Sequence, residues 1–246
     1  MQTFYYTDTG KVRSHNEDSI TIINKENKEF ILAIADGMGG HKAGEVASNI
    51  AITHIEESYR QMSTIGTKEE AIEWLRKIVK EINKKIFAYA KEFPESKGLG
   101  TTLVIAIKTD DYILYGNIGD SSGYVIKNEQ IHKVTKDHTY VRMLLGTGKI
   151  DEETARNHPG KNLLTRALGA NDPIEIDIFD VDTSVNGLFL CSDGLTNMLT
   201  DEQIEKVINS NLPIEEVVVK LIKKANARGG TDNISVAYLK KESGEQ

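Results

Sequence analysis

The sequence contains very little cysteine or proline and no long apolar segment. Its one cysteine, Cys191, excludes an intrachain disulfide framework and any zinc site built from several cysteines. With only 4 prolines, the chain has no proline-rich linker between separate units. No apolar stretch approaches the roughly 20 residues that a membrane-spanning helix needs. We therefore expect one large domain or two small ones, with no membrane association.

An excess of basic residues is also missing. The chain carries 30 Lys and Arg against 37 Asp and Glu, a net charge of −7. This balance argues against a general nucleic-acid binder, whose footprint is basic. The first residues, MQTFYYTDTG, contain no basic region followed by an apolar core, so we expect no secretory signal and a cytoplasmic location. We expect no fused sensor domain or anchor, and a monomer is the default expectation.

The most informative stretch that is present is FILAIADGMGGHKAGEVAS, residues 30–48. Its apolar run, 30–35, predicts a buried strand that ends at Asp36, before a glycine-rich turn and a helix. Such a turn fits either a phosphate or dinucleotide loop or a metal ligand beside flexible backbone. The G-x-G-x-x-G fingerprint fails because Lys42 replaces its last glycine, and no Gly-Lys pair precedes Ser or Thr as a P-loop requires. The metal interpretation then predicts further carboxylates at other strand ends.

Several aspartates share this setting beside Gly or Ser at an expected strand boundary: Asp36, Asp120, Asp193 and Asp232. Any one of them has a simple explanation, because Asp is common in turns. If they converge, together with Glu17 and Asp18, their mutual repulsion would be very costly without cations. Oxygen ligands without a Cys/His set favour Mg²⁺ or Mn²⁺ over zinc, and no EF-hand pattern supports calcium.

Apolar periodicity predicts long helices at 44–60 and 67–92, and two more near 200–210 and 213–228. Thr67 and Glu70 form a capping box at the start of the second helix. The segment 137–169 is less regular, contains a short helix from Asp151, and could be a mobile flap over a site. Strands are expected at 3–7, 19–23, 30–35, 98–108, 112–118, 124–127, 130–134, 174–181, 187–191 and 234–239.

Short motifs occur in a fixed order across residues 10–233: GKVRSHNED, ADGMGGHKAGEVAS, GTT, GDS, DH, LTRALG, LCSDGLTNML and GGTDN. Together they resemble the metal-dependent protein serine/threonine phosphatases of type 2C, in their short bacterial form. The resemblance implies an α+β fold, a central antiparallel β-sandwich flanked by α-helices in four αββα layers. It also implies a single catalytic domain at 1–240, a small irregular flap at roughly 142–168, and a polar C-terminal tail at 241–246.

Matched motif by motif, the resemblance implies a two-metal site, loaded with Mn²⁺ or Mg²⁺, at one end of the sheets. Asp36 would bridge the two ions, and the Gly37 carbonyl would join the second ion. Asp193 and Asp232 would hold the first ion. Asp120, with Asp193, matches the third-metal position of bacterial relatives.

The remaining matched residues would act around these ions. Glu17 and Asp18 would act largely through metal-bound water, and Asn233 would orient the Asp232 turn. Arg13 matches the phosphate-binding arginine. A water or hydroxide that bridges the ions would attack phosphorus in line, so no covalent phosphoenzyme is needed and Cys191 takes no part.

Two departures from the family pattern stand out. Some relatives carry His directly after the Asp-Gly pair, where this chain has Met38, so either His41 or a metal-bound water would protonate the leaving group or place the substrate. The usual Arg after Gly-Asp-Ser is replaced by Ser122, which leaves the neighbouring turn without an expected brace.

The implied function is hydrolysis of phosphoserine and phosphothreonine on proteins, opposing a bacterial serine/threonine kinase that is itself an expected substrate. Two alternatives stay open on sequence grounds. One is a metal-dependent phosphatase for another phosphoester, and the other is a non-catalytic binding module on the same fold.

Overall fold

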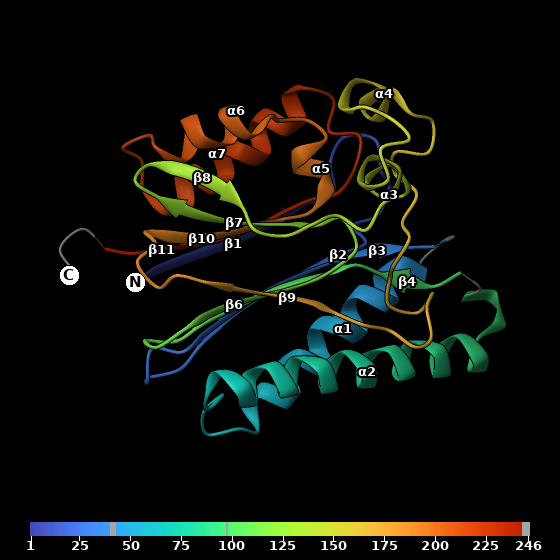
Figure 1. The fold of residues 1–246 in the computed structure, drawn as a ribbon, viewed down its shortest axis with the longest axis horizontal. Coiled ribbons are helices and arrows are strands. Elements are labelled where there is room, and N and C mark those ends of the chain that lie inside the picture. Colours follow the sequence, from blue (N-terminus) through green and yellow to red (C-terminus); the bar gives the residue numbers. More distant parts are fainter. Residues whose placement is uncertain (40–42, 97, 243–246) are drawn as a thin grey trace.

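The structure is a computed structural model that describes residues 1–39, 43–96 and 98–242. Within these residues, two antiparallel β-sheets pack face to face, and helices cover the outer face of each sheet (Figure 1). The α+β class and the αββα order of layers are therefore confirmed. No helix in the described ranges combines the length and the apolar character that crossing a bilayer requires.

The first sheet has the strand order β1-β11-β10-β7-β8, all antiparallel. Its strands are β1 (Gln2–Asp8), β7 (Ser122–Lys127), β8 (Gln130–Lys133), β10 (Gly187–Cys191) and β11 (Ile234–Lys240). The second sheet has the order β2-β3-β5-β6-β9, and the short β4 pairs with the end of β3. Its strands are β2 (Asp18–Asn24), β3 (Phe30–Met38), β4 (Gly100–Thr101), β5 (Leu103–Lys108), β6 (Ile113–Ile118) and β9 (Asp177–Val181).

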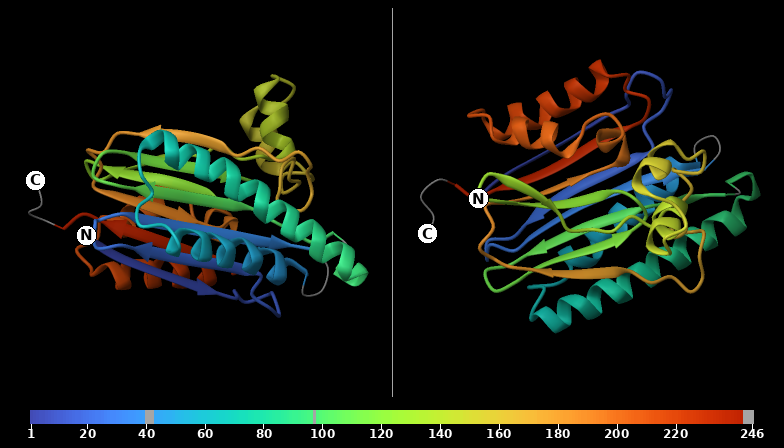
Figure 2. Two further views of the ribbon diagram at one scale, coloured as in Figure 1. Left: turned by 90° about the horizontal axis from the view of Figure 1, so that it is seen from below. Right: turned by 45° about the horizontal axis from the view of Figure 1, so that its top comes forward.

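Helices α1 (Ala43–Arg60) and α2 (Lys68–Glu92) cover the second sheet, and α6 (Asp201–Ile208) and α7 (Ile214–Ala227) cover the first. The predicted capping box of α2 is present, with reciprocal hydrogen bonds between Thr67 and Glu70. The short α5 (Asp193–Thr196) follows β10 directly. Figure 2 shows α3 (Tyr140–Gly146) and α4 (Glu152–Asn157) apart from both helical layers, at the end of the sheets away from the chain termini.

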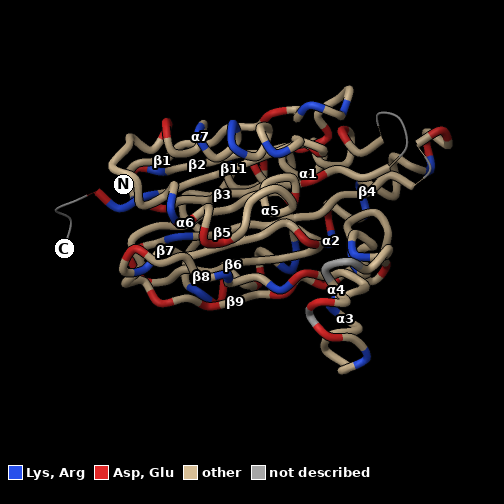
Figure 3. Tube along the Cα trace, turned by 90° about the horizontal axis from the view of Figure 1, so that it is seen from above, with Lys and Arg blue, Asp and Glu red and all other residues tan. Residues whose placement is uncertain are grey.

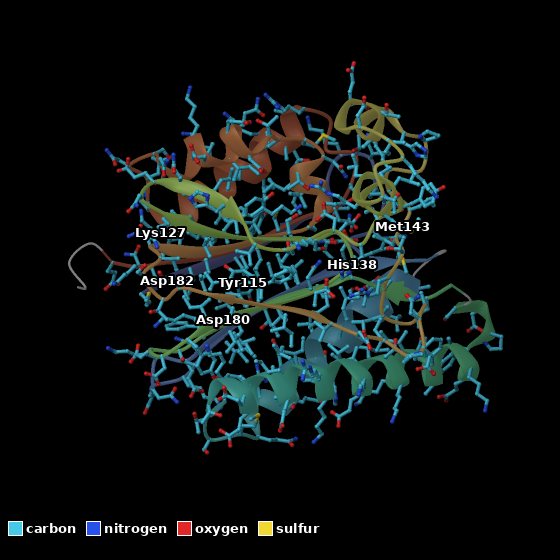
Figure 4. All side chains as sticks on the ribbon, in the orientation of Figure 1. Tyr115, Lys127, His138, Met143, Asp180 and Asp182 are labelled. Atoms are coloured by element: carbon cyan, nitrogen blue, oxygen red, sulfur yellow. The ribbon has the colours of Figure 1, made fainter. Side chains whose placement is uncertain are left out.

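Strand β3 explains why its sequence is an unbroken apolar run. Alternate side chains point to opposite faces of a strand. One set packs under α1 and α2, and the other packs between the two sheets, so both faces are buried. The first set is Ile31, Ala33 and Ala35, and the second is Phe30, Leu32 and Ile34. Tyr115, in the centre of the sandwich (Figure 4), joins the sheets because its hydroxyl donates to the Tyr124 carbonyl at 2.7 Å.

Some short elements leave no clear pattern in the sequence and were not expected. Helix α3 lies in the segment 137–169, for which only the helix from Asp151, observed as α4, was expected. It spans 7 residues and buries only Val141 and Leu144, so its apolar pattern is too short to show a helical period. Helix α5 and the 3₁₀ turn Pro94–Ser96 were missed for the same reason. The expected strand 174–181 begins only at Asp177.

Candidate metal centre

Strand directions gather the acidic residues at one end of the sandwich. Asp18 begins β2, and the register pairs it directly with Asp36 near the end of β3. Asp120 follows β6, Asp193 follows β10, and Asp232 precedes β11. This is the end of the sheets that carries His138 in Figure 4 and α3 in Figure 1.

A cavity of about 580 Å³ opens at this end. Segment 162–167, which lies within the predicted flap, forms its other side. Asp18 does not line the cavity but is buried beneath it, at 7% exposure. The predicted site residues that do line it are Arg13, Glu17, Asp36, Gly37, Asp120, Asp193 and Asp232.

Close backbone packing explains two glycines at the site. A Cβ atom at Gly37 would clash with the carbonyl of Gly44 in the first turn of α1. A Cβ atom at Gly194 would clash with the carbonyl of Asn233. The turns that follow Asp36 and Asp193 therefore touch neighbouring backbone directly, which only glycine permits.

Asn233 ties the N-terminal loop to the Asp232 turn. Its side-chain carbonyl accepts the Glu17 amide at 2.8 Å, and its side-chain amide donates to the carbonyls of Thr9 and His15 at 2.9 and 2.8 Å. Its own backbone amide donates to Asp232 Oδ1 at 2.9 Å. One buried amide side chain thus holds two segments more than 200 residues apart.

Arg13 lies at the mouth of the cavity with about half of its side chain exposed. Its Nη2 donates to Asp232 Oδ2 at 2.8 Å. Because the pair is partly exposed, solvent weakens it. The guanidinium can therefore exchange this partner for another anion in the cavity.

Crowding of carboxylates raises their pKa values. Burial, and then the negative charges of Asp18 and Asp193, raise the pKa of Asp36 well above its usual range. Burial raises the pKa of Asp18 to about 7, with the charge of Asp193 adding to the effect. Burial and the charge of Asp193 raise the pKa of Asp120 to about 7. Burial and the charge of Asp232 raise the pKa of Asp193 to about 6.

Two buried carboxylate oxygen atoms at the site have no hydrogen-bond partner, which bears on whether these residues suit a cation. Asp18 Oδ1 and Asp193 Oδ1 are buried and have no hydrogen-bond partner, although their other oxygens accept from Ser192, Ser235 and Asn197. Unsatisfied carboxylate oxygens in an all-oxygen cluster are what a hard divalent cation binds. The residues therefore fit the predicted ions by chemistry and by unmet bonding capacity.

The present side-chain positions are not those of a closed coordination shell. Among the described residues, no group of three or more His, Cys, Asp or Glu is placed to hold an ion as it stands. Asp232 faces Arg13, and Asp193 accepts from Asn197 at 3.0 Å. An ion bound at this cavity would therefore compete with Arg13 for Asp232 and with Asn197 for Asp193.

His138 is a residue that the sequence pointed to only through its DH motif. Its Nδ1 accepts the Gly119 amide at 3.0 Å, and its backbone amide donates to the Gly119 carbonyl at 2.9 Å. Its Nε2 is 3.1 Å from Asp177 Oδ2. The turn that carries Asp120 is thus braced by His138. Ser122, which replaces the usual arginine, is buried at the start of β7.

Arg166, from the LTRALG motif, was also given no role from sequence. Its Nη1 donates to Asp177 Oδ1 at 2.5 Å, and it lines the cavity. Cys191 is buried outside the cavity lining, and burial raises the pKa of its thiol. His41 falls outside the described residues, while Met38, which directly follows the Asp36-Gly37 pair, lines the cavity.

Comparisons with known proteins agree with this geometry. The chain is 41% identical to "Serine/threonine phosphatase stp" of Listeria monocytogenes serovar 1/2a, over 98% of this chain and 96% of that protein. It is 36% identical to "Protein phosphatase PhpP" of Streptococcus pneumoniae, over 97% of each.

The solved Streptococcus agalactiae serine/threonine phosphatase superposes with a TM-score of 0.93 at 32% identity, covering 98% of this chain and 99% of that one. The Mycobacterium tuberculosis phosphatase PstP/Ppp gives a TM-score of 0.84 at 31% identity, with the same coverage. A family model described as "Protein phosphatase 2C" matches residues 10–234, and the chain belongs to that family.

Proposed function

We propose that this chain hydrolyses phosphoserine and phosphothreonine on proteins, using Mn²⁺ or Mg²⁺ held at the acidic end of the sandwich. The observation that carries the proposal is the cavity itself. It brings acidic residues from distant parts of the chain together beside the half-exposed Arg13. Such a site repels a phosphate group unless cations intervene.

Asp36, the Gly37 carbonyl, Asp193 and Asp232 would hold two ions. Glu17 lines the same cavity and Asp18 supports it from below. A third position is supported because Asp120 and Asp193 line not only this cavity but also a neighbouring one of about 360 Å³. When bound, divalent cations offset the carboxylate charge, polarise the phosphoryl oxygens and lower the pKa of water.

The residues of the chain orient the phosphate and limit where it can lie. Once Asp232 is engaged elsewhere, the Arg13 fork is free to hold two non-bridging phosphate oxygens and stabilise charge on them in the transition state. Asn233 and His138 keep the acidic turns in place through their backbone contacts. The proton for the leaving alkoxide would come from His41 or from solvent in the cavity.

The biological setting follows from this activity as a further part of the proposal. A phosphoprotein phosphatase opposes serine/threonine kinases, and a kinase is a candidate substrate. We place the protein in the cytoplasm as a monomer. A small phosphoester as the natural substrate is the second candidate, because the cavity is open enough to admit one.

Hydrolysis of a phosphothreonine peptide and of p-nitrophenyl phosphate, each with Mn²⁺ and with EDTA, tests the proposal. We expect turnover of both substrates with Mn²⁺ and none with EDTA, and a higher kcat/KM for the peptide. Asp193→Asn should abolish turnover, whereas Asp201→Asn, outside the cavity, should not. Activity that survives EDTA would refute the metal chemistry, and a preference for the small ester would refute the protein substrate.

A further inference from the structure

A second cavity, of about 720 Å³, lies at the opposite end of the sandwich. It is formed by the far ends of the strands that carry the acidic site. Phe30 begins β3, Lys108 ends β5 and Leu188 lies near the start of β10. In Figure 1 this is the end of the sheets near the N-terminus, away from α3 and α4. A volume of this size suits a small organic ligand.

The floor of this second cavity is apolar. Its side chains belong to the core between the two sheets, and each is at most 7% exposed. The inter-sheet core therefore borders this cavity, whose lining residues lie in strands and loops rather than in helices. The floor residues are Phe30, Ile113, Val185, Leu188 and Leu239.

The rim of the second cavity is cationic, in a chain whose net charge is −7. Lys28, Lys108 and Lys241 line it, and Asp110 is the one acidic residue among its described lining residues. Figure 3 shows basic and acidic residues intermingled over the visible elements, whereas lysines outnumber acidic residues among the described residues that line this cavity.

Lys108 is the residue that most clearly indicates a ligand. Lysine is rarely buried, yet this side chain is only 10% exposed. Its Nζ lies 3.3 Å from Asp110 Oδ1, but that side chain is 65% exposed, so solvent weakens the pair. The same Nζ lies 5.9 Å from the centre of the Phe30 ring. A buried ammonium with one weak, solvated partner gains from a further anion in the cavity.

We propose that this second cavity binds a small amphipathic anion. Its apolar part would lie on the floor beside Phe30 and Leu188, and its carboxylate or phosphate group would reach Lys108 and the rim lysines. The proposal does not depend on the phosphatase activity, because none of these residues lines the acidic cavity.

Isothermal titration of the Mn²⁺-loaded protein with octanoate, octylphosphonate and octanol tests this proposal. We expect saturable binding of at least one anion to one site, and at least tenfold weaker binding of octanol, because the charge supplies the recognition. Tighter binding of octanoate would identify a carboxylate ligand, and tighter binding of octylphosphonate a phosphate ligand. No saturable binding by either anion, or equal binding of octanol, would overturn the proposal.

Variants locate the site. Lys108→Gln should weaken anion binding about tenfold, whereas Lys77→Gln, at an exposed position on α2, should leave it within twofold. Because Lys108 is buried, its substitution could also disturb folding. The double variant Lys28→Gln/Lys241→Gln therefore repeats the test at the more exposed rim, and thermal unfolding checks that each variant is folded. Unchanged affinity in both cavity variants, or loss of binding in Asp36→Asn instead, would assign the anion to another site and refute the proposal.

Discussion

Each end of the β-sandwich buries a carboxylate beside the second sheet, and the pKa values of the two carboxylates shift in opposite directions. Glu29, at the lysine-rich end, is 5% exposed, and Asp18, at the acidic end, is 7% exposed. Burial raises the pKa of Glu29, but hydrogen bonds from Thr64, Ile65 and Tyr59 outweigh it, so the pKa is lowered overall. The pKa of Asp18 rises to about 7.

The difference fits the roles proposed for the two carboxylates. Both oxygens of Glu29 accept hydrogen bonds, so its charge is stabilised from within the protein. Asp18 keeps one oxygen without a partner and has Asp193 and Asp232 as like-charged neighbours. A structural carboxylate is supplied with donors, whereas one that serves an external cation is left short of them. The comparison can be tested at both ends.

The largest effect is expected from Asp36→Asn at the acidic end. Asparagine lacks the carboxylate charge with which Asp36 would bridge two ions. Its loss should cost several kcal/mol of transition-state stabilisation. We expect kcat/KM for p-nitrophenyl phosphate at saturating Mn²⁺ to fall on the order of 10³-fold. In the metal-free protein the same change relieves repulsion, so the midpoint of thermal unfolding should rise. Retained activity would show that the acidic end is not the catalytic site.

Arg13→Ala should have the next largest effect. Removing one charged donor from a developing oxyanion typically costs about 10²-fold in kcat. Steady-state kinetics with a phosphothreonine peptide should show this loss. Arg60→Ala, at an exposed position on α1, is the matched control and should be unchanged. Equal kinetics for the two variants would remove Arg13 from phosphate binding.

Glu29→Gln tests the other end. The amide keeps one acceptor but replaces the other oxygen with a donor, which would face either the Thr64 hydroxyl or the Tyr59 hydroxyl and the Ile65 amide. We expect the free energy of unfolding to fall by about 2 kcal/mol in urea titrations, with activity retained. The exposed Glu26→Gln should change it by less than about 0.5 kcal/mol. A stable Glu29→Gln protein would break the contrast between the two ends.

The stability of the metal-free protein should also depend on pH. The pKa values of Asp18 and Asp120 rise from 3.8 to about 7 on folding, so between these limits the folded state binds more protons than the unfolded chain. The free energy of unfolding of the EDTA-treated protein should therefore fall as pH rises through this window, by at least about 1.4 kcal/mol. Mn²⁺ should remove this decline. Urea titrations from pH 5 to pH 8, with EDTA and with Mn²⁺, measure it, and parallel curves would contradict it.

Much of the fold can be predicted from local sequence because burial leaves a periodic trace. The run 187–191 gives β10 without error, and the Thr67–Glu70 capping box places the start of α2 correctly. The acidic residues could be found because the same residue type recurs at successive strand ends. That they share a cavity depends on sheet order, which single strands do not encode.

The features that escaped prediction depend on contacts between distant segments. His138 reaches Asp177, 39 residues away, and the local sequence around either residue gives no sign of the pair. The lysines of the second cavity stand at 28, 108 and 241, each at a different strand end and outside any motif. Such sites become visible only once the strands are placed side by side.

The antiparallel register that sets Asp18 opposite Asp36 has a consequence for the β2–β3 hairpin. Like charges directly across a ladder weaken it, and here they stand at the open mouth of the hairpin, farthest from its turn. Backbone amides near Asp18 should therefore exchange with deuterium sooner than those near Asn24, and a cation between the two carboxylates would slow that exchange. Binding of a cation between Asp18 and Asp36 would therefore oppose local opening of the sheet at this pair of residues.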